Sequence, residues 1–180
     1  MALDPEDAIG KPCPVKKCTK SYTMLGRIWK GTVRMSEQAV TYRGTVYPWH
    51  CDHMGHMNVM WYVGKFDEAT WQFFSHIGMP RSWFSSEGTG MAAVEQRIEY
   101  KRELHAGDLI SIRSAALEVK EKSIRFVHEM TNDETGELAA RTIIVGVYFN
   151  TTDRKSLPLP KDIRERAQLS IVQVEARSDA

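Results

Sequence analysis

The sequence predicts an α+β protein in which one long helix packs on an antiparallel sheet of about five strands. A single long stretch with helical spacing of apolar residues occupies positions 59–77. One strand-like segment precedes it, and several segments with strand-like alternation follow between residues 94 and 149, most of them separated by short turns. One helix combined with strands that are joined mostly by tight turns is typical of a two-layer α+β domain.

The first strand is predicted at residues 39–47. β-Branched and aromatic residues, which favour pleated strands, recur there as Val40, Tyr42, Thr45 and Val46. Pro48 follows and cannot donate to a strand ladder, so it is expected to end the strand.

The helix is predicted to begin after Asn58, whose side chain suits an N-cap, and to stop at Gly78, with Pro80 beyond it. Lys65 and Asp67 are expected to lie away from its apolar face. Residues 79–90 are expected to form a loop. The apolar face consists of residues spaced by three and four: Val59, Tyr62, Val63, Phe66, Ala69, Thr70, Phe73, Phe74 and Ile77.

Four further strands are predicted after this loop. Residues 94–101 alternate between outward and inward side chains, as in a half-exposed strand, and residues 124–130 alternate in the same way. Another strand is predicted between these two segments, at residues 109–119. Residues 138–149 are apolar on both faces, which predicts a strand in the interior of the sheet. A short charged helix is predicted at residues 162–168.

The first 35 residues differ from the rest, so we divide the chain into an N-terminal extension, 1–35, and a domain, 36–180. Residues 1–34 carry seven Lys/Arg and three Asp/Glu, a net charge of +4 against +1 for the whole chain. Three prolines interrupt this segment and it has no regular period, so we expect a flexible basic extension. Two alternatives stay open: a basic arm that docks on a partner, or a native start at Met35.

Composition excludes several classes of function. A net charge of +1 gives no reason to expect a nucleic-acid partner. No apolar run approaches the roughly 20 residues that span a bilayer, so no membrane partner is expected. Three cysteines are too few for a disulfide framework, and no apolar secretory core is visible at the N-terminus. A reducing, cytoplasmic location is therefore expected.

Residues 50–58, His-Cys-Asp-His-Met-Gly-His-Met-Asn, form the most informative segment. Asp52 is placed just before the predicted helix start at Asn58 and Val59. The first backbone N–H groups of a helix have no partner within the helix and attract negative charge. A carboxylate beside such groups can activate a nucleophile while the N–H groups stabilise the oxyanion that follows attack on a carbonyl. The segment therefore indicates acyl transfer.

The Asp-x-x-Gly-His-x-Asn pattern of residues 52–58 resembles the active-site segment of hot-dog-fold acyl-CoA thioesterases of the 4-hydroxybenzoyl-CoA thioesterase type. The resemblance covers residues 40–149 and extends to the order strand, loop, long helix and four strands. It implies a hot-dog fold, with Asp52 as the catalytic carboxylate. The other catalytic-site residues expected from it and from the helix start are Gly55, His56, Asn58 and Val59.

Two roles remain open for Asp52. An aspartate with a pKa near 3.9 is ionised at neutral pH. Its oxygen can attack the thioester carbon and form a mixed anhydride, or it can take a proton from an attacking water. Gly55 is interpreted either as a turn residue or as a residue that leaves room for the substrate.

The resemblance also implies an acyl-CoA substrate, no cofactor, and association into a homodimer or homotetramer with active sites where two subunits meet. Trp61 and Tyr62 on the helix are candidates for contact with the acyl group, and an aromatic pocket would suit even a quaternary ammonium group. Basic residues are expected to meet the CoA phosphates, and Arg81, Lys101 and Arg102 are the candidates.

Three alternatives compete with this interpretation. His50, Asp52, His53 and His56 offer metal ligands, but their spacing is not that of a helical site and the family resembled uses no metal, so no metal is expected. A hot-dog hydratase or dehydratase would pair His56 with Asp52. A non-catalytic acyl-CoA-binding protein would bind the thioester without cleaving it. The identity of the acyl group, and CoA or acyl carrier protein as its carrier, stay open.

Overall fold

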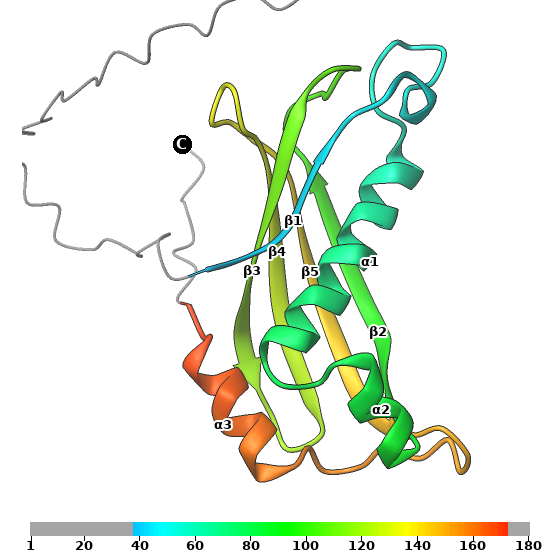
Figure 1. Ribbon diagram of the computed structural model, residues 1–180, viewed down its shortest axis with the longest axis vertical. Helices are drawn as coiled ribbons and strands as arrows, with labels where there is room; N and C mark the ends of the chain where they lie inside the picture. Colours follow the sequence, from blue (N-terminus) through cyan, green and yellow to red (C-terminus); the bar gives the residue numbers. More distant parts are fainter. Residues whose placement is uncertain (1–37, 173–180) are drawn as a thin grey trace, which may run out of the picture. The chain divides into compact units, whose positions relative to one another are not determined.

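The computed structural model describes residues 38–172. The predicted N-terminal extension, 1–35, lies outside these residues. The described chain forms one antiparallel sheet of five strands and a long helix, as predicted, together with shorter helices (Figure 1). Along the chain these are β1 (Ala39–Thr45), η3 (Pro48–His50), α1 (Val59–His76), α2 (Arg81–Glu87), β2 (Thr89–Tyr100), β3 (Leu109–Val119), β4 (Ser123–Asn132), β5 (Leu138–Asn150) and α3 (Lys161–Leu169).

The strands are ordered β1-β3-β4-β5-β2, so the first two strands of the chain form the two edges of the sheet. Helix α1 connects them and crosses one face of the sheet (Figure 1). The interior position predicted for residues 138–149 is confirmed, because β5 pairs with β4 on one side and β2 on the other. Ile112, Met130 and Ala140 are cross-strand partners in β3, β4 and β5, and all three are fully buried under α1.

The apolar face of α1 forms the core, although the predicted face was too wide. Phe66, Ala69 and Phe73 are fully buried, whereas Val59 and Val63 are 56% and 40% exposed. Phe66, Ala69 and Phe73 face the sheet directly, so Val59 and Val63 lie at the margin of the contact between helix and sheet. None of the helices among residues 38–172 has the length and apolar character needed to cross a membrane.

Lys65 was expected on the solvent side of α1, and this prediction was wrong. Its side chain is buried, and its Nζ donates to the Tyr42 hydroxyl of β1 at 2.9 Å. The ammonium also lies 5.1 Å from the centre of the Tyr42 ring. A long aliphatic stem lets a lysine cover apolar surface while its charged end reaches a polar partner, and sequence spacing does not reveal that partner.

The segment predicted as a loop at residues 79–90 contains helix α2, which was missed because seven residues are too few to show a helical period. Phe84 is buried against the end of α1, and Gly88 ends the helix with a φ of 60°, the left-handed conformation that favours glycine. The terminal helix was predicted correctly at its centre, and α3 packs Ile163 and Ala167 into the same core cluster.

Strand β2 starts at Thr89, five residues before the predicted alternation. A register shift between Ala93 and Glu95 interrupts that alternation, and Val94 is 62% exposed at this point. Val94 is therefore the extra residue of a bulge, which the regular alternation did not predict; an extra residue in one strand of an antiparallel pair interrupts the regular pleat.

A chain of hydrogen bonds lies buried between α1 and the sheet, centred on His128 of β4. The Thr70 hydroxyl donates to the Phe66 carbonyl at 2.8 Å, so its oxygen accepts from Nε2–H of His128 at 2.9 Å. Nδ1 then accepts from the Ser114 hydroxyl, which is in turn 2.6 Å from the Thr41 hydroxyl. Both ring nitrogens of the neutral imidazole are therefore hydrogen-bonded. Burial lowers the pKa of His128 to about 3.

We predict that His128 makes the fold less stable as the pH falls from about 6.5 toward 3. In this window the unfolded chain protonates the imidazole and the folded chain does not, so the free energy of unfolding decreases by up to about 1.4 kcal/mol per pH unit. Urea unfolding of His128→Gln should show a shallower pH dependence than the unsubstituted protein. His105→Gln, at a side chain 59% exposed, is the control and should keep the original slope; equal slopes for all three proteins would refute the assignment.

Candidate active site

The 50–58 segment connects η3 to α1 by a tight, hydrogen-bonded loop. Cys51 and Met57 form an antiparallel bridge, and the Asp52 N–H donates to the His56 carbonyl at 3.1 Å. Gly55 has a φ of 86°, and a Cβ at this position would meet nothing within 4 Å. The glycine is therefore required by the backbone conformation of the turn and not by crowding within the chain.

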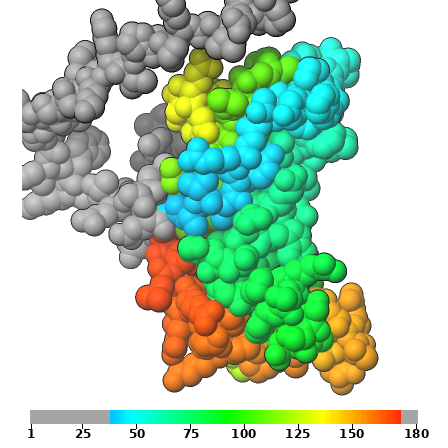
Figure 2. Space-filling view, in the orientation of Figure 1, coloured from blue at the N-terminus to red at the C-terminus, as the bar shows by residue number. Residues whose placement is uncertain are grey.

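Neighbouring backbone holds this segment in place. The Met57 N–H donates to the Leu104 carbonyl at 2.7 Å, and the Asn58 N–H donates to the His50 carbonyl at 2.9 Å. The Met57 and Leu104 side chains are buried in the core cluster that includes Tyr62 and Phe66. The loop is thus exposed at the surface (cyan in Figure 2) but anchored to the core at its base.

Both carboxylate oxygens of Asp52 accept hydrogen bonds from this segment. The Met54 N–H donates to Oδ1 at 2.9 Å, and Nδ2 of Asn58 donates to Oδ2 at 3.0 Å. The Met54 hydrogen bond is the largest cause that lowers the pKa of Asp52; the Asn58 hydrogen bond and the nearby His56 and His53 lower it further. Donors that stabilise the charged form keep this carboxylate ionised at neutral pH.

Asn58 has a second function as the N-cap of α1. Its Oδ1 accepts from the Met60 N–H at 3.1 Å, so one amide group both caps the helix and binds Asp52. The expectation of a free N–H at Asn58 was wrong, because that N–H binds His50. Among the hydrogen bonds of residues 38–172, none is donated by the Val59 N–H, which stands at the first position of the helix.

His56 does not hydrogen-bond to Asp52 through its side chain. Its Nε2 lies 3.9 Å from Oε1 of Glu103, and only its backbone carbonyl reaches the Asp52 N–H. His50 is buried and lies 4.4 Å from the Trp61 ring, centre to centre, and burial is the main cause that lowers its pKa. In the described part of the chain, no three His, Cys, Asp or Glu side chains are grouped so that they could hold a metal ion.

The predicted substrate-binding residues lie in different places. Trp61 packs on His50 beside the loop. Tyr62 is buried, its hydroxyl donates to the Arg102 carbonyl at 3.5 Å, and burial is the main cause that raises its pKa to about 12. Arg81 begins α2, beyond the far end of an 18-residue helix that is about 27 Å long, and so is not brought near Asp52 within this chain.

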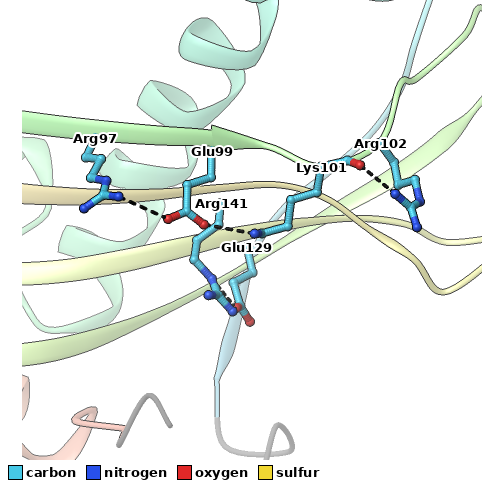
Figure 3. Close-up of polar contacts among 6 residues, drawn as sticks. All are labelled: Arg97, Glu99, Lys101, Arg102, Glu129 and Arg141. Carbon is cyan, nitrogen blue, oxygen red and sulfur yellow. Dashed lines mark hydrogen bonds and ion pairs between the residues drawn. The ribbon is translucent and has the colours of Figure 1, made fainter. Parts of the chain in front are cut away.

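Lys101 and Arg102 follow β2 and take part in surface ion pairs. Nζ of Lys101 lies 3.0 Å from Oε2 of Glu99, and Nε of Arg102 lies 3.4 Å from Oε1 of Glu137. Figure 3 shows the side chains of Arg97, Glu99 and Lys101 on the face of the sheet turned away from α1. The Lys101 ammonium is therefore not directed toward Asp52, which lies at the start of α1.

The structure also shows a cleft of about 210 Å³ that was not predicted from the sequence. It runs along α1 and is bounded by β2, β4 and β5 on its other side. The sequence carried a signal for its helical wall, because four of the lining residues recur at spacings of three to four. The lining consists of Val63, Asp67, Thr70, Trp71, Phe74, Met91, Ala93, Gln96, Phe126, Ile144 and Gly146.

Comparisons with known proteins agree with this architecture. The sequence profile of the thioesterase-like superfamily matches residues 46–167. The chain is 22% identical over 134 residues to a betainyl-CoA thioesterase of Pseudomonas aeruginosa, covering 74% of this chain and 84% of that protein. It is 25% identical over 120 residues to the long-chain acyl-CoA thioesterase FadM of Escherichia coli, covering 67% and 90%.

A solved structure from Staphylococcus aureus, determined in complex with CoA, superposes with a TM-score of 0.70 at 18% sequence identity. The match covers 78% of this chain and 91% of that protein, and it establishes the shared fold. The chain belongs to the thioesterase-like superfamily, and its fold is the hot-dog fold. Its enzymatic class is that of a thioester hydrolase.

Substitution of Asn58 should separate its two functions. Asn58→Ser keeps an N-cap oxygen for the Met60 N–H but, being shorter, no longer extends a donor to Asp52, so the pKa of Asp52 should rise with little change in stability. Asn58→Ala should raise the pKa equally and also cost about 1 kcal/mol of stability through loss of the cap. Carbon-13 NMR titration of the Asp52 carboxylate and urea unfolding measure the two effects. An unchanged pKa in both variants would contradict the hydrogen bond.

Proposed function

We propose that this protein hydrolyses an acyl-CoA thioester to the free acid and CoA, with Asp52 as the catalytic carboxylate. One observation carries the proposal. The Asp52 carboxylate is kept ionised by two hydrogen-bond donors, and the Asn58 side chain ties it to the helix start where the Val59 N–H has no partner among the described residues. An ionised oxygen and a free N–H are the two groups that thioester cleavage requires.

Two routes use these groups. In the first, an Asp52 oxygen attacks the thioester carbon, the C–S bond breaks, and the thiolate leaves and takes a proton; water then hydrolyses the mixed anhydride. In the second, Asp52 removes a proton from the water that attacks the same carbon, the C–S bond then breaks, and the leaving thiolate takes the proton back from Asp52. In both routes the negative charge on the thioester oxygen is stabilised by the Val59 N–H. One such donor typically lowers the barrier by about 2.7–4 kcal/mol.

The choice of a CoA thioester is supported by the relatives and by the surroundings of the loop. Both relatives described above are CoA thioesterases, and the superposed structure was determined with CoA. Arg102 lies in the segment whose backbone binds Tyr62 and Met57, and its side chain is 65% exposed. We propose that Arg102 binds the CoA phosphates. Lys101 is directed to Glu99 on the face of the sheet turned away from α1, and Arg81 lies beyond the far end of α1.

Hydration or dehydration of an acyl thioester is a weaker candidate. That chemistry would use a paired histidine and acid, and the His56 imidazole is directed to Glu103 and not to Asp52. A non-catalytic acyl-CoA-binding protein differs from both because it would release no thiol. The geometry of Asp52 favours hydrolysis over these two.

Assembly into a homodimer, with further pairing into a tetramer, belongs to the same proposal. β2 is a twelve-residue edge strand, and within the described residues only β5 pairs with it. Its central side chains, from Ala93 to Arg97, are exposed. An edge strand of this length exposes backbone donors and acceptors that a second copy can pair with. We infer that β2 pairs with β2 of a second subunit and that the active site lies beside this contact.

Replacement of the catalytic carboxylate should abolish most activity. Asp52→Asn is nearly isosteric and should lower kcat by at least about 100-fold, because the amide is neither a base nor a nucleophile. The measurement is thiol release from a panel of acyl-CoAs with a thiol reagent. Asp108→Asn, in a carboxylate that binds the His105 N–H outside the loop, is the control. A folded Asp52→Asn enzyme with unchanged turnover would overturn the proposal.

The dimer contact can be tested on the edge strand. Val94→Lys places a charge in the exposed centre of β2 and should shift the protein from dimer to monomer in sedimentation velocity. Val40→Lys introduces the same charge on the opposite edge strand, β1, where Val40 is 41% exposed, and should leave the dimer intact. If Val94→Lys remains a dimer and Val40→Lys becomes a monomer, the subunits meet along β1 and the proposed β2 contact is wrong.

A further inference from the structure

Trp49 has the most exposed aromatic side chain in the part of the chain that the structure describes, at 66%. It belongs to η3 and stands three residues before Asp52. The indole stacks on the Tyr47 ring, with 4.5 Å between ring centres and 7° between the ring planes, and meets the His50 ring edge to face at 5.8 Å. Because Tyr47 covers one face of the indole, the exposed surface lies on the other face.

Local contacts fix the position of this aromatic platform, by which we mean the stacked rings of Tyr47 and Trp49. The Tyr47 N–H donates to Nδ1 of His50 at 3.0 Å, and His50 is buried. Val46, directly before the platform, is fully buried, and its N–H donates to the Asp108 carbonyl at 2.9 Å. A ring that is already held in place loses little conformational freedom when a ligand stacks on it.

The platform is connected to the proposed catalytic centre. The carbonyl of His50, the residue after Trp49, accepts from the Asn58 N–H at the start of α1. The short chain between Trp49 and Asp52 allows at most about 11 Å between their Cα atoms. The flexible arm of CoA, from the sulfur to the nucleotide, is longer than this separation. A CoA thioester bound at Asp52 can therefore bring its nucleotide to the platform.

An adenine ring fits the open face of Trp49 better than an acyl group does. A nucleic-acid base has large flat faces that stack on aromatic side chains, and a polar edge that stays hydrated at an exposed site. An aliphatic chain on the same face would be covered on one side only, so little of its apolar surface would leave water. The exposure of Trp49 thus favours a flat ring with polar edges.

We propose that the adenine ring of CoA stacks on the open face of Trp49. This inference rests on the proposed function and specifies the carrier of the acyl group as CoA. An acyl carrier protein holds the same phosphopantetheine arm on a protein side chain and has no adenine. The enzyme therefore gains binding from the platform with a CoA thioester and gains none with a carrier-protein thioester.

The proposed phosphate contact lies along the same border of the loop. The segment 102–108 starts at Arg102, accepts from the Met57 N–H through Leu104, and reaches the residue before the platform through Asp108. It thus passes beside the loop that carries the proposed catalytic carboxylate and connects the phosphate contact to the adenine contact.

Two thioesters of the same acyl group test the role of the indole. Acyl-CoA carries the adenine nucleotide, and acyl-4′-phosphopantetheine lacks it. Trp49→Ala should lower kcat/KM for acyl-CoA by about 10-fold and leave kcat/KM for acyl-4′-phosphopantetheine unchanged. Trp49→Phe keeps a flat ring and should keep most of the preference for CoA. Trp71→Ala removes another exposed tryptophan, in the middle of α1, and should leave the ratio of the two values unchanged.

Several results overturn the inference. An equal loss with both thioesters in Trp49→Ala makes the indole a support of the loop, and no loss with either makes it irrelevant to binding. Dissociation of the subunits of Trp49→Ala in sedimentation velocity makes the platform a subunit contact. A higher kcat/KM for an acyl carrier protein thioester than for the matching acyl-CoA also contradicts the assignment of the carrier.

Binding measurements separate failure of this inference from failure of the proposed function. Calorimetry with Asp52→Asn, which should not consume its ligand, measures the affinity for acyl-CoA and for acyl-4′-phosphopantetheine. If adding Trp49→Ala weakens the binding of acyl-CoA alone, the inference holds even when no thioester is hydrolysed. If Asp52 proves essential for hydrolysis but Trp49→Ala changes neither affinity, the proposed function stands and the adenine site is wrong.

Discussion

The arrangement of the candidate site depends on one amide side chain. Asn58 donates to the Asp52 carboxylate and accepts from the Met60 N–H, so it connects the ionised oxygen to the start of α1. The distance between the carboxylate and the first free N–H of the helix is therefore fixed by local hydrogen bonds and not by long-range packing. The core still contributes, because Met57 is buried beside Leu104 and anchors the loop base from which Asp52 projects.

Helix α1 supports two separate tasks on different parts of its surface. One row of side chains, which includes Phe66 and Phe73, is fully buried against the sheet and supplies most of the helix's contribution to the core. The adjacent row, from Val63 to Phe74, forms one wall of the cleft. Because the buried row fixes the rotation of the helix, it also determines that Asp67 and Trp71 face this cleft. The stability of the fold and the lining of the cleft are thus coupled through one helix.

The histidines show how position in the fold decides chemical behaviour. His128 is enclosed in a satisfied hydrogen-bond chain, and burial keeps it neutral, which makes it a structural residue of the core. His50 is likewise buried against Trp61 and hydrogen-bonded to the Tyr47 N–H. His56 remains at the surface near Glu103. In the function proposed above, Asp52 is the residue of this loop that acts in acyl transfer.

The sequence by itself determined the fold class, the long helix with its Asn58 cap, and the position of Asp52 next to the helix start. Those features depend on periodicity, capping and turn chemistry, which act over a few residues. The tertiary structure alone decided the burial of Lys65, the outward position of Val94, the direction of Lys101 and the existence of the cleft. Each of these depends on which side chains from distant strands come to lie beside the helix or in the neighbouring register, and no local pattern in the chain specifies those partners.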